Sequence, residues 1–468
     1  IQTCLNRLNG TWGLLIINVD EPEKLYCVRR GSPLLVSENE DFIIVSSEQS
    51  GFNGKVLNYF ILEGNDLCEM YYENGKLKIK TDNKYKLKNT INNNFDLTPY
   101  PYEHWTIKEI EEQYESSLRA LSFGGRLLND NKVKLGGLEG HTEILKRIDN
   151  IIFLACWTSY NAALLGCKYF KELCNFNTVT IFDGAEFDSK DIPRIGNTAL
   201  VFLSQSGETK DLHRCIKIGQ DNDLFLIGIV NVIDSMIARE VDCGVYLNAG
   251  LEISVASTKS FTSMIIVLSL ISLWFDRYNI NNTNKLNSLR SLSNTITSIL
   301  YSIEFLKSIE SIKKTICENM INNIFILGKS NLYPIALEAS LKIKEVCYIH
   351  CEGFSASSLK HGPLALLDKT NLTLLLIDYT DKTNYKNLQS TYYEINSRET
   401  NLIVITNHEK VVTDLNLNKT NSLLLPYLDY YNEIIFIIAL QLLAYQLSIE
   451  KNINPDQPRN LAKVVTVE

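Results

Sequence analysis

The feature that most constrains the fold is a pair of similar segments, each an apolar run followed by a turn of small residues and a helical pattern. The first reads IDNIIFLACWTSYNAALL from Ile148, and the second reads INNIFILGKSNLYPIALEA from Ile321, with Phe153 and Phe325 in matching places. A strand, a turn and a helix in this order predict parallel strands in an α/β sheet. Their recurrence predicts an internal duplication.

Further apolar runs extend each copy into a sheet. Strand candidates in the first copy are IIFLA, TALVFL, LFLIGIV and GVYLN, and those in the second are LTLLLI, LIVIT and SLLLP. Nearly continuous apolar runs of this kind are typical of strands buried on both faces of a parallel sheet. We therefore predict two five-stranded, doubly wound α/β domains, the first of which ends in an apolar helix from Ser260 to Phe275.

The chain up to about Lys80 follows a different pattern, with short β-rich runs such as TWGLLIINV, LYCVRR and VLNYFILEGN between turn residues. This pattern predicts a sheet without helices. The polar, Asn-rich stretch that follows carries Pro99 and Pro101 and predicts a linker. Thr106 and Glu109 have the spacing of a capping box, which predicts a helix over residues 107–121.

The net charge and the length of the apolar stretches limit the classes of partner that we expect. The 468-residue chain has a net charge of −8. This balance argues against a nucleic acid partner, which needs a basic face. The longest apolar stretch, Ile434 to Ala444, is too short to cross a bilayer, so we expect a core helix and no membrane partner.

The eleven cysteines form no CxxC pair and have no histidine nearby at metal spacing. The sequence therefore predicts neither a zinc site nor a disulfide framework, and we expect no metal and no cofactor. Reduced thiols of this kind are typical of the cytoplasm, where we expect the protein to reside. The chain begins at Ile1 without a methionine, which indicates a fragment or a processed product.

Two stretches rich in hydroxyl groups follow predicted strands, at the end of an open α/β sheet where ligands bind. They are CWTS, Cys156 to Ser159, and SQSGET, Ser204 to Thr209. Backbone N–H groups of the helix that follows each stretch, together with the hydroxyls, can converge on a phosphate. Each stretch alone fits an ordinary capped turn equally well, but two at adjacent strand ends favour a phosphate site. No P-loop or dinucleotide motif is present.

The second copy carries the ionisable residues. Glu338, Lys342 and Glu345 lie at i, i+4 and i+7, which places them on one helical face. A solvated stripe of ion pairs is the alternative interpretation. His361 follows Lys360 just before a Gly-Pro break. A lone histidine is usually structural, but a histidine near a helical carboxylate is also an arrangement used for proton transfer.

Five segments together resemble a known family. They are SQSGETKD, ISVASTKSFT, YPIALEASLKIKEVCYIH, LKHGPLALLD and the terminal DQPRNLAKVVTVE. In this order they are similar to the isomerase half of the glutamine–fructose-6-phosphate aminotransferases, also called glucosamine-6-phosphate synthases. The resemblance implies two tandem sugar isomerase (SIS) domains that convert fructose 6-phosphate and ammonia into glucosamine 6-phosphate.

The resemblance also assigns roles to single residues. It implies that Lys463 forms an imine with the open-chain ketose and that Glu345 carries a proton between C1 and C2, with Glu338 and Lys342 as further catalytic residues. His361 matches a ring-opening histidine that the neighbouring subunit contributes, so a homodimer with a shared site is implied. The phosphate is expected at Ser159, Ser204, Gln205, Ser206 and Thr209, and the sugar at Cys156, Thr158, Val255, Ser257 and Ala462.

The β-rich first block resembles the second half of the family's glutaminase domain, an Ntn-type fold. The matching stretches are GTWGLLIINVDEPEKLYCVRRGSPLLV and YFILEGNDLCEM. The family's glutaminase uses an N-terminal cysteine as its nucleophile, whereas this chain opens IQTCLNRL, and Cys4 is neither terminal nor in a matching motif. We therefore do not expect the chain as given to hydrolyse glutamine.

The expected organisation has five parts. They are a partial glutaminase-like domain at 1–85, a linker and connecting helix at 86–141, the first SIS domain at 142–285, the second SIS domain at 286–458 and an active-site tail at 459–468.

Two residues depart from the family's pattern within the expected site. Trp157 replaces the glycine of Cys-Gly-Thr-Ser, and Ser358 replaces the glutamate of GELKHGP. If the glycine position takes a positive φ, tryptophan costs on the order of 1 kcal/mol or more there. These departures leave three functions open: a synthase that uses ammonia, an aldose–ketose phosphate isomerase without amination, and a sugar-phosphate-binding regulator without catalysis.

Overall fold

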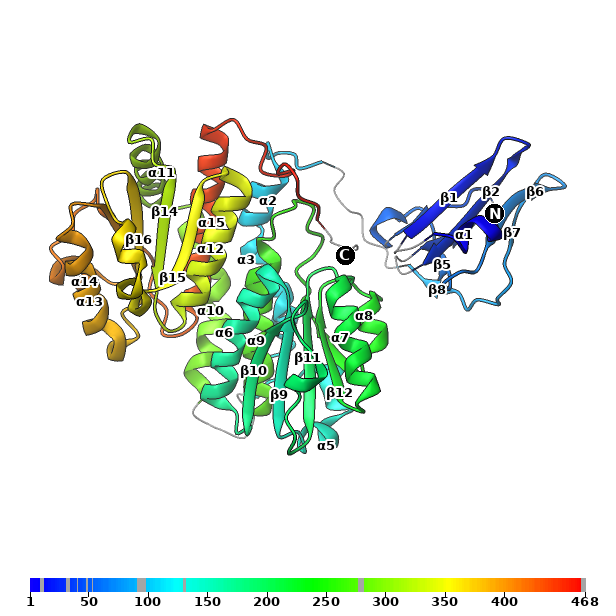
Figure 1. The fold of residues 1–468 in the computed structure, drawn as a ribbon, viewed down its shortest axis with the longest axis horizontal. Helices are drawn as coiled ribbons and strands as arrows, with labels where there is room; N and C mark the ends of the chain where they lie inside the picture. The colour runs from blue at the N-terminus through cyan, green and yellow to red at the C-terminus, as the bar shows by residue number, and fades with distance from the viewer. Residues whose placement is uncertain are drawn as a thin grey trace. The chain divides into compact units, whose positions relative to one another are not determined.

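The computed structural model describes residues 1–8, 12–30, 34–39, 41–47, 49–52, 54–90, 98–128, 132–276 and 282–463. The chain forms two compact units (Figure 1). Ile1–Thr98 make up the bulk of the first, and Pro99–Gly207 with Asp211–Lys463 make up the second.

The first unit is rich in strands, as predicted, and contains two four-stranded sheets. One is built from β1 (Trp12–Asn18), β2 (Glu21–Arg30), β6 (Cys68–Glu73) and β7 (Lys76–Lys80), and the other from β4 (Val45–Ser46), β3 (Leu35–Glu38), β5 (Asn58–Ile61) and β8 (Lys88–Asn89). Their inner faces share a core that includes Cys27, Val36 and Phe60. The expectation of a sheet without helices is wrong in detail, because α1 (Gln2–Leu5) and the 3₁₀-helix η1 (Gln49–Phe52) are present.

The second unit contains two parallel five-stranded sheets with the same strand order. The first runs β10-β9-β11-β12-β13 and the second runs β15-β14-β16-β17-β18, so in each copy the first strand lies between the second and the third. The predicted duplication of a doubly wound domain is confirmed by this shared topology. The first sheet consists of β9 (Asn150–Ala155), β10 (Thr178–Asp183), β11 (Thr198–Ser204), β12 (Phe225–Val230) and β13 (Cys243–Tyr246). The second consists of β14 (Asn323–Gly328), β15 (His350–Ser355), β16 (Asn371–Ile377), β17 (Asn401–Thr406) and β18 (Ser422–Leu424).

Two edge strands, β10 and β15, escaped sequence analysis. β10 leaves most of its residues exposed or half-buried, and β15 begins with the exposed His350. An edge strand has one neighbour and a partly solvated face, so its sequence lacks the continuous apolar run that marks the central strands.

The strand register corrects the match between the two copies. Asn150 begins β9 and pairs with the first residue of each neighbouring strand, and Asn323 does the same in β14. Counted from these asparagines, Phe153 corresponds to Ile326, so the match with Phe325 is wrong by one residue. A shift of one residue along a strand exchanges the two faces of the sheet. Phe153 and Ile326 accordingly share one core, whereas Phe325 packs in another.

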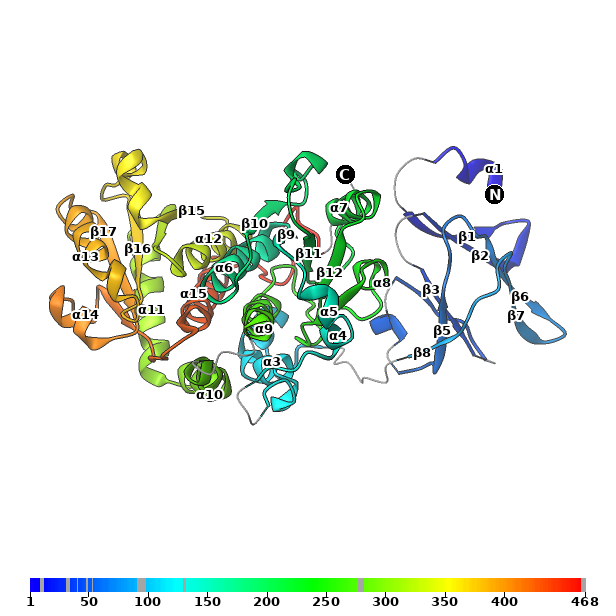
Figure 2. The same cartoon turned by 90° about the horizontal axis from the view of Figure 1, so that it is seen from below.

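Helices cover both faces of each sheet (Figures 1 and 2). On the first sheet, α6 (Trp157–Leu173) and α9 (Lys259–Phe275) cover one face, and α7 (Lys210–Asp221) and α8 (Met236–Glu240) cover the other. On the second, α12 (Leu332–Cys347) and α15 (Asn432–Glu450) face the first domain, and α13 (Lys382–Asn396) and α14 (Glu409–Asp414) lie opposite. α12 packs on α6, and one apolar core runs through both domains.

Helix α15 is the core helix that the apolar stretch from Ile434 predicted. It is long and apolar enough to cross a membrane, but 83% of its most apolar window is buried inside the structure. Its two sides contact α12 and α11 (Ile303–Glu318). A helix that is apolar all round is expected when protein surrounds it on every side.

The predicted capping box at Thr106 is wrong. α2 (Trp105–Glu111) begins before Thr106, a break separates it from α3 (Gln113–Ala120), and Glu109 faces a distant loop. Instead Asp456, from the segment after α15, caps the helix. Its carboxylate accepts hydrogen bonds from the backbone N–H of Trp105 at 2.8 Å and of Thr106 at 2.7 Å, and from the Thr106 hydroxyl at 2.7 Å. This cap fixes the C-terminal segment against the connecting helices.

Candidate active site

The two α/β domains meet at a polar contact between the start of α6 and the middle of α12. The Thr158 hydroxyl donates to Glu338 Oε1 at 3.0 Å, and the Asn161 amide donates to Glu338 Oε2 at 2.9 Å. Glu338 is fully buried, and each of its two carboxylate oxygens accepts a hydrogen bond from the first domain. Helix α6 starts immediately after β9, which is why its first turn lies at the carboxyl end of the first sheet.

Lys342 lies at the centre of the ionic cluster on α12. Its ammonium nitrogen is 2.6 Å from Glu345 Oε2 and 3.4 Å from Glu338 Oε1, and it donates to the Thr158 hydroxyl at 3.2 Å. The side chains of Lys342 and Glu338 are 3% and 0% exposed, and that of Glu345 is 21% exposed. The solvated-stripe interpretation is therefore wrong, because two of the three charges are buried.

Burial and charge compete in setting the protonation of this cluster. Desolvation would lower the pKa of Lys342, but Glu345 and Glu338 together raise it above its usual value, so the lysine stays charged. Burial raises the pKa of Glu338 against the opposing effect of Lys342. Glu345 is the member of the cluster with access to solvent, and it is held in place by the buried cation.

Near the C-terminus, Lys463 forms an ion pair with Glu252, at 2.7 Å between its ammonium nitrogen and Glu252 Oε2. Glu252 is fully buried, and its other oxygen accepts the backbone N–H groups of Thr258 and Ser260 at the start of α9. Desolvation alone would raise the pKa of Glu252, but Lys463 and these N–H donors lower it to about 2. Glu252 also interacts electrostatically with Lys342, so the tail lysine lies near the cluster on α12.

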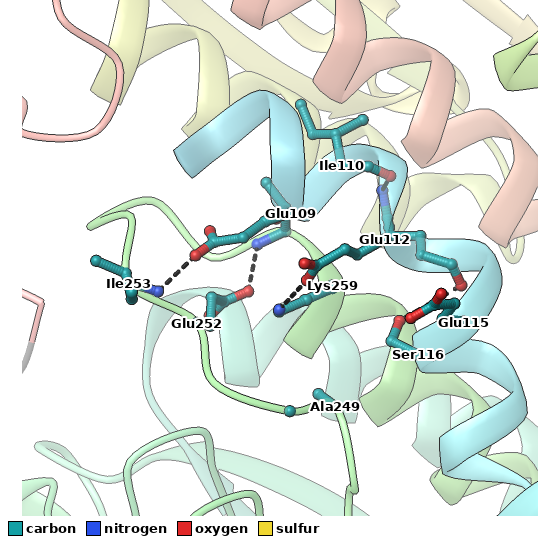
Figure 3. A network of polar contacts seen from close by, with 12 residues as sticks. Glu109, Ile110, Glu112, Glu115, Ser116, Ala249, Glu252, Ile253 and Lys259 are labelled. Carbon is teal, nitrogen blue, oxygen red and sulfur yellow. Dashed lines mark hydrogen bonds and ion pairs between the residues drawn. The ribbon is translucent and has the colours of Figure 1, made fainter. Parts of the chain in front are cut away.

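Two more carboxylates fix the loop that carries Glu252 (Figure 3). Glu109 accepts the backbone N–H of Ile253 at 2.5 Å and both the N–H and the hydroxyl of Ser254. Glu112, one turn further on, pairs with the buried Lys259 at 2.5 Å. The segment from residue 252 to the start of α9 is thus tied to α2 and to Glu112, the residue that follows α2, by side chains that local sequence patterns do not connect.

The stretch that follows β11 forms a capped turn. The Ser204 hydroxyl accepts the backbone N–H of Gly207 at 3.0 Å, and the Gln205 carbonyl accepts that of Asn231. Gly207 has φ +69°, and a Cβ atom there would lie 2.1 Å from the Ser235 hydroxyl oxygen. Only glycine fits this close approach, so the glycine of SQSGET shapes the turn. Ser206 and Thr209 belong to the same stretch, which leads into α7.

The stretch after β9 contains the unusual Trp157. This residue has φ 47° and its side chain is 72% exposed. The position where the family's pattern has glycine thus takes a positive φ, so tryptophan occupies a backbone conformation that favours glycine. Cys156 precedes it as the N-cap of α6, and burial raises the pKa of its thiol to about 12. Ser159 lies in the first turn of α6 beside Thr158.

The structure brings some of the predicted residues together and leaves others apart. Thr158, Glu338, Lys342 and Glu345 form one cluster, and Lys463 lies near it. Val255 donates its backbone N–H to the Asp456 carbonyl at 3.0 Å, and Ser257 is half-buried in the same loop. Ala462 is exposed beside Lys463.

His361 lies outside this cluster. It ends the 3₁₀-helix η5 (Ala356–His361), where it is exposed. Within the described part of the chain it forms no hydrogen bond or ion pair, whereas its neighbour Lys360 pairs with Glu394. Ser358, the second departure from the family's pattern, is an exposed residue of the same 3₁₀-helix.

Sequence analysis missed Glu252, Glu109 and Asn161. Glu252 directly precedes the segment ISVASTKSFT, so its position next to that segment was the available signal. Glu109 was assigned to a local cap because Thr106 is three residues away, yet its partners lie more than 140 residues along the chain. Asn161 follows Thr158 by three residues, the spacing that places both on one face of α6.

Replacing Lys342 with methionine leaves two carboxylates without their cation, one of them fully buried. We expect Lys342→Met to lower the free energy of unfolding by about 3–5 kcal/mol, because removal of one partner of a buried ion pair leaves the other charge uncompensated. Urea denaturation followed by circular dichroism measures this. Lys369→Met is the matched control, since Lys369 pairs with Glu399 on the surface. Equal losses in the two variants would contradict a structural role for the buried cluster.

Replacing Trp157 with glycine removes the strain of a positive φ. We expect Trp157→Gly to raise the free energy of unfolding by about 0.5–1 kcal/mol, because glycine relieves the strain but gains freedom in the unfolded chain. Trp157→Ala is the control, since alanine keeps the Cβ atom and hence the strain. A gain in stability for alanine equal to that for glycine would show that φ is not the cause.

The chain is similar to proteins of one known family. Residues 144–273 and 320–451 each match the SIS domain family. A probable glutamine–fructose-6-phosphate aminotransferase (isomerizing) of Acanthamoeba polyphaga mimivirus is 40% identical over 98% of this chain and 74% of its own length. The glutamine–fructose-6-phosphate aminotransferase (isomerizing) of Chlorobaculum tepidum is 30% identical over 100% of this chain and 76% of its own.

Solved structures agree with the observed fold. The C-terminal domain of glucosamine-fructose-6-phosphate aminotransferase from Francisella tularensis covers 77% of this chain with a TM-score of 0.68 and 27% identity, and all of that chain is matched. A glucosamine-6-phosphate deaminase from Thermotoga maritima has a TM-score of 0.57 over 77% of this chain and 99% of its own, and at 23% identity it supports the fold alone. With two SIS domains and relatives of this identity along nearly its whole length, the chain belongs to the family of isomerizing glutamine–fructose-6-phosphate aminotransferases.

Proposed function

We propose that this protein converts fructose 6-phosphate and ammonia-derived nitrogen into glucosamine 6-phosphate. The observation that carries the proposal is the cluster around Lys342 at the carboxyl end of the first sheet. Lys342 holds Glu345, whose side chain is 21% exposed, and contacts Thr158. A carboxylate in this setting can accept a proton from a bound sugar and return it to the adjacent carbon. The names of the curated relatives supply the substrate class.

The first domain supplies the phosphate contacts in this proposal. The hydroxyls of Ser159, Ser204, Ser206 and Thr209 and the Gln205 side chain follow two adjacent strands, where α6 and α7 begin. The first turn of a helix offers backbone N–H groups and a positive dipole end, which favour an anion without arginine. Cys156, Thr158, Val255, Ser257 and Ala462 would surround the sugar.

Lys463 is the proposed imine-forming residue. Its amine must be neutral to attack the C2 carbonyl of the open-chain ketose. In the structure the ammonium group is paired with Glu252, so binding of substrate has to separate the pair or remove its proton. Attack on C2 then releases the carbonyl oxygen as water, and ammonia displaces the lysine from the imine.

Glu345 is the proposed proton carrier. It would take the C1 proton to form an enamine and return the proton to C2, which yields the aldose with nitrogen on C2. Base catalysis of this kind contributes about 10²- to 10⁴-fold to the rate. Lys342 and Glu338 position the carboxylate, since Lys342 contacts both. His361 is proposed to open the sugar ring in a site shared with the second subunit of a homodimer.

A plain aldose–ketose isomerase is the second candidate. The cluster that holds Glu345 is complete without a nitrogen donor, and proton transfer between C1 and C2 is the shared step of both reactions.

Variants of Lys463 and Glu345 separate the two candidates. Incubation with fructose 6-phosphate, with and without ammonium, followed by mass spectrometry is expected to show a hexosamine phosphate only when ammonium is present. Lys463→Arg keeps the charge that pairs with Glu252 but cannot form an imine, so it should lose amination by about 10²-fold or more. Glu345→Gln should lose both amination and isomerisation. Isomerisation without amination in the unaltered protein would select the second candidate.

Mixing two inactive variants tests the shared site. If His361 acts in the partner's site, a mixed dimer of His361→Ala and Glu345→Gln has one doubly altered site and one intact site. Random exchange of subunits should then restore about a quarter of the unaltered activity, as closed dimer symmetry requires. No recovery after verified subunit exchange would place His361 and Glu345 in the same subunit's site.

A further inference from the structure

A second crevice opens at the carboxyl ends of the strands in the second sheet, with a volume of about 530 Å³. It lies where the first domain has its hydroxyl-rich loops, at the starts of α12, α13 and α15. Its lining includes carboxylates, lysines and tyrosines. The carboxylates are Glu172, Asp378, Asp381, Asp429 and Glu433, the lysines are Lys329 and Lys382, and the tyrosines are Tyr427, Tyr430 and Tyr431. The proposed reaction uses none of them.

The charge of this crevice is opposite to that of a phosphate site. Five carboxylates line it, against two lysines. Both lysines already have partners, since Lys329 donates to the Ser357 hydroxyl at 2.5 Å and the Lys382 nitrogen lies 2.8 Å from the centre of the Tyr379 ring. A phosphate group entering here would therefore meet an excess of negative charge.

Three of the five carboxylates are committed to the fold. Asp381 caps α13 through the backbone N–H of Asn384 and also accepts its side-chain amide. Glu172 pairs with Lys285 at 3.0 Å. Asp378 accepts a backbone N–H and a side-chain amide, each at 2.8 Å. The other two, Asp429 and Glu433, form no ion pair within the described part of the chain.

Glu433 is a lining residue with a carboxylate oxygen that lacks a hydrogen-bond partner among the described residues. Glu433 is 3% exposed, and its Oε2 atom is buried without a hydrogen-bond partner among the described residues. Burial and the nearby Asp378 raise the pKa of Glu433 to about 7, against the lowering effect of hydrogen bonds from its own backbone N–H and from the Asn331 side chain. Lys168 of α6 interacts with it electrostatically without forming an ion pair in the described structure. An ammonium group placed at Oε2 would supply both the missing donor and the missing charge.

Tyrosine rings complete the lining. Tyr427, Tyr430 and Tyr431 line the crevice, and Lys285 already lies over the Tyr430 ring, 4.6 Å from its centre. The faces of tyrosine rings attract cations, and carboxylates bind them directly. From this combination we propose that the crevice between α12, α13 and α15 binds a small organic molecule that carries an ammonium group.

Putrescine and its neutral isostere butane-1,4-diol test this proposal on the full chain. We expect isothermal titration calorimetry at constant ionic strength to show binding of putrescine and none of the diol. Equal binding of the two compounds would overturn the proposal, because a cation would not be required. Displacement of putrescine by an equal concentration of magnesium chloride would also overturn it, in favour of an inorganic cation.

Matched variants locate the binding. Glu433→Gln keeps the shape of the side chain and should weaken putrescine binding about tenfold or more through loss of a charge-assisted contact. Asp429→Asn, at an exposed position that does not threaten folding, should weaken it in the same direction. Glu399→Gln removes one exposed surface charge and should leave binding unchanged. An equal loss in Glu399→Gln would show unspecific attraction to the negative protein and would contradict the proposal.

The same variants distinguish this crevice from the proposed active site. Glu433→Gln should leave product formation from fructose 6-phosphate unchanged, and Glu345→Gln should bind putrescine as the unaltered protein does. If Glu345→Gln abolished putrescine binding while Glu433→Gln did not, the ligand would occupy the active site and the proposal would be wrong.

Discussion

The cluster on α12 depends on one buried cation, the ammonium group of Lys342. It holds Glu338 and Glu345 on its own helix and contacts Thr158 of the other domain. Two carboxylates next to each other in a dry interior repel, and only a charge between them makes the arrangement stable. Because Thr158 and Asn161 complete the contact from the first domain, the same interaction that stabilises the cluster also sets the junction between the two domains.

The two α/β domains share a topology and differ at the ends of their strands. The first carries serine, threonine and glutamine where helices begin, and the proposed function uses these neutral groups to bind an anion. In the second, Asp381 and Glu433 occupy the starts of α13 and α15, so carboxylates already meet the helix dipoles. The two copies therefore share one scaffold but carry different chemical groups at the ends of their strands.

Sequence patterns found most of the scaffold but misjudged contacts between distant segments. Apolar runs located the central strands, and the spacing of Glu338, Lys342 and Glu345 placed them on one face. The pattern of Thr106 and Glu109 indicated a local cap, whereas the actual cap is Asp456, about 350 residues away. Edge strands such as β10 were missed because their partly solvated faces interrupt the apolar run.

The sequence by itself determined the duplicated α/β architecture, the family and which residue types could take part in catalysis, because strand periodicity and short motifs are local properties. Only the tertiary structure decided that Glu338 and Lys342 are buried, that Lys463 pairs with Glu252, and that Trp157 has a positive φ. Burial and partner choice depend on which surfaces meet across the fold, and a pattern along one segment carries no record of the segment that packs against it.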